Sequence, residues 1–125
     1  MNRAKVLTAI AFLLSAGLWY AAAQENGTPS VAQSTVQKIE LKASNFQFTP
    51  DTIRVKVGVP VELRIVSIEG NHGFAIPALK INERLDQGKE VVVSFTPTQT
   101  GKYPFRCSVP CGSGHMDMKG VLIVQ

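Results

Sequence analysis

Short runs of alternating apolar and polar residues fill the sequence from residue 38 onward. Apolar side chains occupy every second position in Ile39–Ala43, Ile53–Val57 and Val61–Ile65. A period of two places these side chains on one face of a β-strand, whereas a helix requires a period of about 3.6. Residues 78–88 show no such period, and we expect an irregular loop with a short strand there. The sequence therefore predicts an all-β domain, a sandwich of seven or eight short strands.

The first 23 residues have a different pattern, that of an export segment. Arg3 and Lys5 precede an apolar run of 18 residues, Val6–Ala23, which ends in three alanines. Positive charge, apolar run and small residues in this order are typical of a secretory signal peptide. The run is also long enough to span a bilayer as a helix, so an uncleaved membrane anchor is the alternative. Both interpretations predict a periplasmic or otherwise extracytoplasmic protein, soluble after signal cleavage or tethered to the membrane through residues 6–23.

The chain after this segment divides into a linker and one domain. Residues 24–37 are rich in polar and turn-forming residues without an apolar period, which indicates a flexible linker, and the domain is expected over 38–125. Of the 13 basic residues, two belong to the export segment, which leaves 11 against 9 acidic residues. The basic residues are scattered along the sequence rather than clustered, so a nucleic-acid partner is not expected.

A stretch between the last two predicted strands concentrates the side chains that bind soft metals. It holds both cysteines, one of the two histidines and two of the three methionines of the chain, namely Cys107, Cys111, His115, Met116 and Met118. Thiolate, imidazole and thioether ligands suit copper and are wrong for calcium or magnesium. The other histidine, His72, lies at the end of an earlier predicted strand, and strand-end loops of a sandwich gather at one pole. We therefore expect His72 to meet the 107–118 loop at one metal site.

Other interpretations of this stretch explain fewer of its residues. Two cysteines in an exported domain are compatible with a disulfide, but a disulfide explains neither His115 nor Met118. A zinc site of two cysteines and two histidines would also leave Met118 without a role, and it usually has shorter ligand spacings. Met116 and Asp117 are interpreted as loop residues, with Met116 as an alternative thioether ligand to Met118.

The string C-x3-C-x3-H-x2-M, from Cys107 to Met118, resembles the CuA motif of cytochrome c oxidase subunit II and of the C-terminal domain of nitrous oxide reductase. The segment Asn71–Pro77 resembles the H-x-F-x-x-P segment of that family, and Phe46–Val61 resembles the early strands of cupredoxins. The resemblance covers residues 38–125 and implies a cupredoxin-like Greek-key β-sandwich.

The resemblance also implies a cofactor of two copper ions and a set of ligands. Cys107 and Cys111 would each bridge both ions, while His72 would bind one ion and His115 the other. Met118 would be a weak ligand to one ion, and the backbone carbonyl of Val109 a weak ligand to the other. The oxidase family usually has glutamate where this chain has Val109, a change that leaves a carbonyl ligand possible but removes an acidic side chain.

These features predict a copper-binding electron-transfer protein rather than an enzyme, because the loop offers neither an open coordination position nor a general base. The expected partners are a redox donor and acceptor, such as a cytochrome c-like protein or a terminal oxidase or reductase of which the chain could be a subunit, and a copper chaperone. The only tryptophan is Trp19, so docking of cytochrome c through a tryptophan-containing aromatic patch is not expected. The alternatives are a periplasmic copper-trafficking protein and a mononuclear blue-copper protein in which Cys107 is spare.

Overall fold

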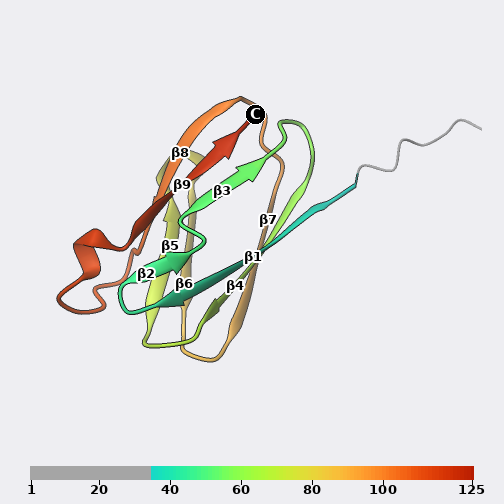
Figure 1. Ribbon diagram of the computed structural model, residues 1–125. Coiled ribbons are helices and arrows are strands. Elements are labelled where there is room, and N and C mark those ends of the chain that lie inside the picture. Colours follow the sequence, from blue (N-terminus) through green and yellow to red (C-terminus); the bar gives the residue numbers. More distant parts are fainter. Residues whose placement is uncertain (1–34) are drawn as a thin grey trace, which may run out of the picture. The chain divides into compact units, whose positions relative to one another are not determined.

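Nine strands make up the fold of residues 35–125, the part of the chain that the computed structural model describes (Figure 1). In chain order they are β1 (Gln37–Ser44), β2 (Gln47–Thr49), β3 (Thr52–Val55), β4 (Val61–Ser67), β5 (His72–Ile76), β6 (Ile81–Leu85), β7 (Glu90–Phe95), β8 (Gly101–Arg106) and β9 (Lys119–Val124). Two 3-10 helices, η1 (Pro77–Leu79) and η2 (His115–Asp117), are the only helices among these residues. The strand beyond the predicted seven or eight is β2, which has three residues and one buried side chain and is too short to show a period.

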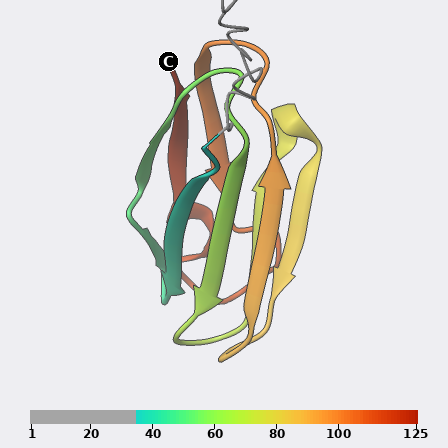
Figure 2. The same cartoon turned by 90° about the vertical axis from the view of Figure 1, so that its right-hand side faces the viewer.

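The strands form two sheets with the orders β2-β1-β4-β7 and β3-β9-β8-β5-β6. Figure 2 shows the first sheet with β1, β4 and β7 side by side. Two of the pairings, β1 with β4 and β3 with β9, are parallel, and the others are antiparallel. Both sheets are therefore mixed, and the chain crosses from one sheet to the other between β2 and β3.

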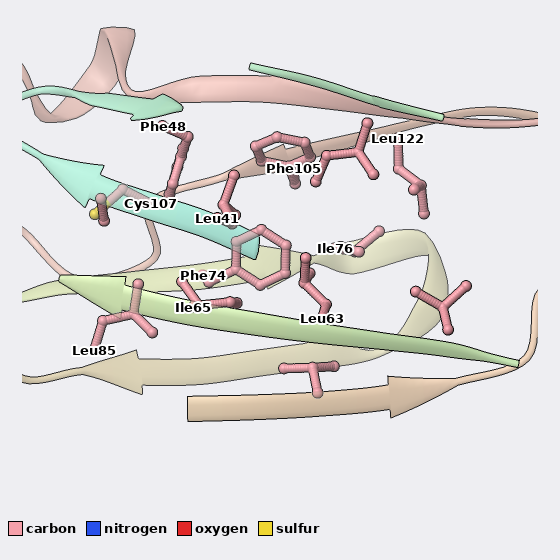
Figure 3. Packing of buried hydrophobic residues seen from close by; sticks show 14 of the residues in the cluster. Leu41, Phe48, Leu63, Ile65, Phe74, Ile76, Leu85, Phe105, Cys107 and Leu122 are labelled. Atoms are coloured by element: carbon pink, nitrogen blue, oxygen red, sulfur yellow. The ribbon is translucent and has the colours of Figure 1, made fainter. Parts of the chain in front are cut away.

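The core lies between the sheets and follows from the alternation in the sequence. In β4, every second residue from Val61 to Ser67 is buried, and the residues between them are partly exposed. Phe48, Phe74 and Phe105 meet in the core with ring centroids 5.3–5.8 Å apart. Their rings adopt edge-to-face and tilted arrangements, and aromatic pairs prefer an edge-to-face geometry to face-to-face stacking. Figure 3 shows Phe74 and Phe105 directed into the space between the sheets, with Cys107 at one end of the same cluster.

The predicted export signal or anchor, residues 1–23, and most of the linker, 24–37, lie outside the described residues. β1 begins at Gln37, one residue before the predicted start of the domain. Among residues 35–125 there is no helix with the length and apolar character required to span a membrane.

Candidate metal centre

The loop with the predicted ligands is closed at its base by the last two strands. β8 ends at Arg106 and β9 begins at Lys119, and these two residues are register partners. The next residue inward continues this pairing, because the Cys107 amide donates to the Met118 carbonyl oxygen at 2.9 Å. Cys107 and Met118 are consequently both buried, with exposed fractions of 2% and 1%. The core thus fixes the two ends of the loop.

The other side of the centre is built by the start of β5. His72 is its first residue and is fully buried, and Ala75 further along β5 pairs with Arg106 of β8. The Gly73 amide donates to the sulfur of Cys107, with the nitrogen 3.4 Å from Sγ. A Cβ atom on Gly73 would lie 2.9 Å from the Val109 nitrogen and 3.0 Å from that of Ser108. Glycine therefore allows the ligand loop to lie directly against β5.

The four predicted side-chain ligands with nitrogen or thiol donors follow one another at close distances, and we call this series of neighbouring donor atoms the row. The distance from His72 Nδ1 to Cys107 Sγ is 4.0 Å, from Cys107 Sγ to Cys111 Sγ 3.6 Å, and from Cys111 Sγ to His115 Nδ1 3.5 Å. The donor atoms of His72, Cys107 and Cys111 all lie within 4.8 Å of one another. Each histidine is therefore nearest to a different cysteine, and His72 also lies close to the second sulfur, so the first three donors form a compact triangle.

The orientation of His72 is set by the turn that precedes it. Its Nε2 lies 2.7 Å from the Glu69 carbonyl oxygen, so this nitrogen carries the proton and Nδ1, which faces Cys107, has the free lone pair. This turn is itself held by the buried Ser67, whose hydroxyl donates to the Gly70 carbonyl oxygen at 2.5 Å. A metal ligand held in one tautomer by a backbone carbonyl is a common arrangement in metal sites.

The two weak ligands implied by the resemblance have different surroundings. The carbonyl oxygen of Val109 lies 3.1 Å from Cys107 Sγ and accepts a hydrogen bond from that thiol, so it points into the row of donor atoms. The Met118 side chain is buried in the same core cluster as Cys107. Met116, the alternative thioether, is 82% exposed and belongs to no part of the core.

The electrostatics of the metal-free centre favour the neutral form of the Cys111 thiol. Burial, together with the hydrogen bond and like charge of Cys107, raises the pKa of the Cys111 thiol to about 11. At neutral pH Cys111 therefore holds its proton until a metal binds, and metal uptake releases that proton.

Phe46, between β1 and β2, packs against the ligand loop of residues 107–118. Its ring packs against Gly112, where a Cβ atom would lie 2.8 Å from Phe46 Cζ. A Cβ atom on Gly114 would overlap the ring and lie 2.6 Å from Phe46 Cβ. The two glycines thus let the ligand loop pack closely against the ring of Phe46. His115 directly follows Gly114, the second of them.

We expect Gly114→Ala to lower the free energy of unfolding by about 1–3 kcal/mol, because the added methyl group overpacks the contact with Phe46. Urea unfolding of the metal-free protein measures the change. The same substitution in a Phe46→Ala background removes the obstructing ring, so its cost should fall to a fraction of the first value. An equal cost in both backgrounds would show that the contact with Phe46 is not the cause.

Several residues that shape the centre were not identified from the sequence. Gly73, Glu69 and Ser67 act through close approach or backbone hydrogen bonds, which leave little trace in composition. The one available signal was Gly73 inside a strand pattern, since a glycine in a strand often marks a close backbone approach.

A β-sandwich with two thiols and two imidazoles in a row at one end defines a metal-binding domain with a soft ligand set, of the kind that copper prefers. Residues 9–124 match the cupredoxin-like domain family. Cytochrome c oxidase subunit 2 of Thermus thermophilus is 30% identical over 108 residues, which cover 82% of this chain and 80% of that protein. The chain therefore belongs to the cupredoxin-like family, and its copper-binding domain is related to that of oxidase subunit II.

Solved structures agree with this fold. The periplasmic domain of subunit II of the cytochrome oxidase of Bradyrhizobium japonicum has a TM-score of 0.66 at 17% identity, covering 71% of this chain and 83% of that one. A chain of a heme-copper terminal oxidase dimer has a TM-score of 0.65 at 26% identity, covering 71% of this chain and 65% of that one. The expected cupredoxin-like sandwich is thereby confirmed.

Proposed function

We propose that the protein transfers electrons through a binuclear copper centre of the CuA type. Six residues would hold the two ions, namely His72, Cys107, Val109 through its backbone carbonyl, Cys111, His115 and Met118. The observation that carries the proposal is the row of donor atoms, in which two sulfurs lie 3.6 Å apart and each has a different imidazole nitrogen within 4.0 Å. Both thiolates and both imidazoles would therefore be in reach of bound copper.

The residues around the row suit electron transfer. Copper held by these residues would supply one-electron exchange. Cys107, Met118 and His72 are buried, and the hydrogen-bonded loop base and the Glu69 carbonyl hold them in place. Ligands that are already held in one geometry keep the reorganisation on electron transfer small. The Gly73 amide also donates to Cys107 Sγ, a hydrogen bond of the kind that tunes a thiolate ligand.

The same row argues against a mononuclear blue-copper site. Such a site places one cysteine beside two histidines. Here the nearest sulfur to His115 Nδ1 is Cys111 Sγ at 3.5 Å, and His72 lies 4.0 Å from Cys107 Sγ and within 4.8 Å of the Cys111 sulfur. A mononuclear site on Cys111 would leave a buried thiol, that of Cys107, in the middle of the ligand set with no role.

The location and partners of this proposal rest on the N-terminal pattern and on the relatives. Residues 1–23 would export the domain to the periplasm or anchor it to the outer face of the membrane, and residues 24–37 would link it. The domain would exchange electrons with a cytochrome c-like protein or with a terminal oxidase or reductase, as the relation to oxidase subunit II suggests. Loading would involve a copper chaperone. The cysteines would also need to be reduced, because two sulfurs this close can oxidise to a disulfide.

The test is the copper content and the electron paramagnetic resonance spectrum of the full-length protein, reduced and then loaded with copper. Two ions per chain, with one unpaired electron shared equally by both nuclei, support the proposal. One ion with a single-nucleus signal would replace it by the mononuclear site. Copper bound only as silent Cu(I), and lost rapidly to a chelator, would replace it by copper trafficking.

A further inference from the structure

Four basic side chains from three neighbouring strands lie on the outer face of the five-stranded sheet. They are Arg54 on β3, Lys102 and Arg106 on β8, and Lys119 on β9, and all four are exposed. Arg54 and Lys102 are both register partners of Ile123, and Arg106 is paired with Lys119. Register partners project to the same face of a sheet. We call this surface the basic face.

The direction of these side chains follows from their neighbours along each strand. Ile53, Phe105 and Leu122 are buried in the core between the sheets. Successive side chains of a strand point to opposite faces, so Arg54, Arg106 and Ile123, which adjoin these three, point outward. Lys102 and Lys119 point outward with them, because they are the register partners of Ile123 and Arg106. The sheet order β3-β9-β8 makes the three strands adjacent, and Figure 1 shows them side by side.

Among residues 35–125, no ion pair neutralises the charge of the basic face. The strands β3, β8 and β9 contain no aspartate or glutamate. The ion pairs among residues 35–125 involve Arg64 and Arg84 and none of the four residues of the basic face. Two carboxylates lie at its margins, Asp51 next to β3 and Asp117 next to β9, and Asp51 accepts a hydrogen bond from Thr52.

The outer face of the other sheet has a different charge pattern. Its strands carry both signs, and Arg64 there pairs with Glu62 and Glu90 at 2.8 and 3.1 Å. Such a surface has little net field, whereas four unpaired cations on one face attract an anionic surface over about a Debye length, about 8–10 Å in physiological salt. The two faces of the sandwich therefore differ in the partners that they attract.

The centre of the basic face is apolar. Val121 and Ile123 are partly buried between the cations, and the exposed Pro104 is the register partner of Val121. A small apolar centre with a charged rim is typical of transient protein interfaces. No long apolar or aromatic side chain projects from these positions, as insertion into a lipid surface would require.

The basic face also begins at the metal centre. Arg106 directly precedes Cys107, and Lys119 directly follows Met118. A protein that docks on this face would therefore lie against the two strands that hold the ligand loop.

We propose that the basic face, the outer surface of β3, β9 and β8, is the docking surface for a redox partner with an acidic surface. The proposal rests on the electron-transfer function proposed above, because that function requires a redox partner close to the ligand loop. Complementary charge would steer the partner to this face and set the salt dependence of the encounter.

A pair of haem proteins of opposite surface charge tests the proposal. Succinylated cytochrome c, whose lysines carry carboxylates, and native cytochrome c are titrated into the metal-free, full-length chain, and binding is followed by nuclear magnetic resonance. We expect succinylated cytochrome c to bind, to shift amide signals of β3, β8 and β9, and to dissociate as salt is raised. Native cytochrome c should not bind to this face.

Charge-reversal variants supply the matched control. In Arg54→Glu with Lys102→Glu, both changes lie away from the ligands, and the dissociation constant for succinylated cytochrome c should rise about tenfold. The control, Lys38→Glu with Lys42→Glu, makes the same change in net charge at exposed positions of β1. It should change the dissociation constant for succinylated cytochrome c less than twofold. The milder Arg54→Gln with Lys102→Gln should give an intermediate loss, which protects the test against misfolding of the first variant.

Two results would overturn the proposal. Equal losses in the two reversal variants would show that net charge alone governs binding. The Arg54→Glu with Lys102→Glu variant could also bind succinylated cytochrome c unchanged and lose only binding to vesicles that contain phosphatidylserine. That result would assign the face to a membrane. Because binding is measured without metal, failure of the electron-transfer function would appear in the resonance spectrum of the copper-loaded protein and not here.

Discussion

With the proposed binuclear centre, replacement of Cys107 by serine will abolish the mixed-valence signal of the copper-loaded protein and lower its copper content from two ions per chain to one or none. The Cys107 sulfur lies 4.0 Å from His72 Nδ1 and 3.6 Å from Cys111 Sγ, so it links one end of the row of donors to the middle. A serine hydroxyl is a hard donor that is protonated at neutral pH and does not replace a bridging thiolate. Copper analysis and electron paramagnetic resonance of the loaded variant measure both effects.

The control is Ser113→Ala, an exposed position of the same loop that is not a proposed ligand. It should keep both copper ions and the full signal. If Cys107→Ser instead keeps one copper ion with the spectrum of the unaltered protein, Cys107 is a spare residue and the centre is mononuclear. That result would leave the cupredoxin-like fold intact and overturn the binuclear site.

Phe74→Ala should lower the free energy of unfolding by about 3–5 kcal/mol, the range for deletion of a fully buried phenylalanine side chain. Phe74 is fully buried and contacts the rings of Phe48 and Phe105, with centroids 5.8 and 5.3 Å away. These three rings come from β2, β5 and β8, so the cavity would lie where both sheets meet. Chemical unfolding of the metal-free, reduced protein measures the loss.

The matched control for this prediction is Val92→Ala on β7, whose side chain is 47% exposed. It should change the free energy of unfolding by less than about 0.5 kcal/mol, as is usual for surface substitutions. A loss of under about 1 kcal/mol for Phe74→Ala would mean that the core collapses around the missing ring. The aromatic cluster would then not be the main support of β5, the strand that starts with His72.

Local patterns in the sequence predicted most of the individual strands. Runs such as Val61–Ile65 became β4 with its alternation intact, because the period of two depends only on which face of a strand is buried. β2 was missed, since three residues with a single buried phenylalanine provide no period. The parallel pairings β1–β4 and β3–β9 were also not evident, because partner and register depend on residues far apart in the chain.

The candidate ligands were predicted in the same local way, from the spacing of Cys107, Cys111, His115 and Met118 within one loop and from the upstream His72. Their order in space is a property of the folded chain, since it depends on β5 lying against the loop through Gly73. The spacing of residues in one loop does not specify which histidine contacts which cysteine. The ligand assignment itself remains a proposal for the resonance experiment to test.

The basic face shows most clearly the difference between what the sequence predicts and what only the folded chain determines. Arg54 lies 48 residues before Lys102 in the sequence, and the basic residues look scattered along the chain. Sheet pairing places Arg54, Lys102, Arg106 and Lys119 on three adjacent strands, because β9 lies between β3 and β8. Periodicity and ligand chemistry are short-range properties that can be read along the chain. Strand order, donor geometry and surface charge arise from long-range pairing, and therefore exist only once the sandwich has formed.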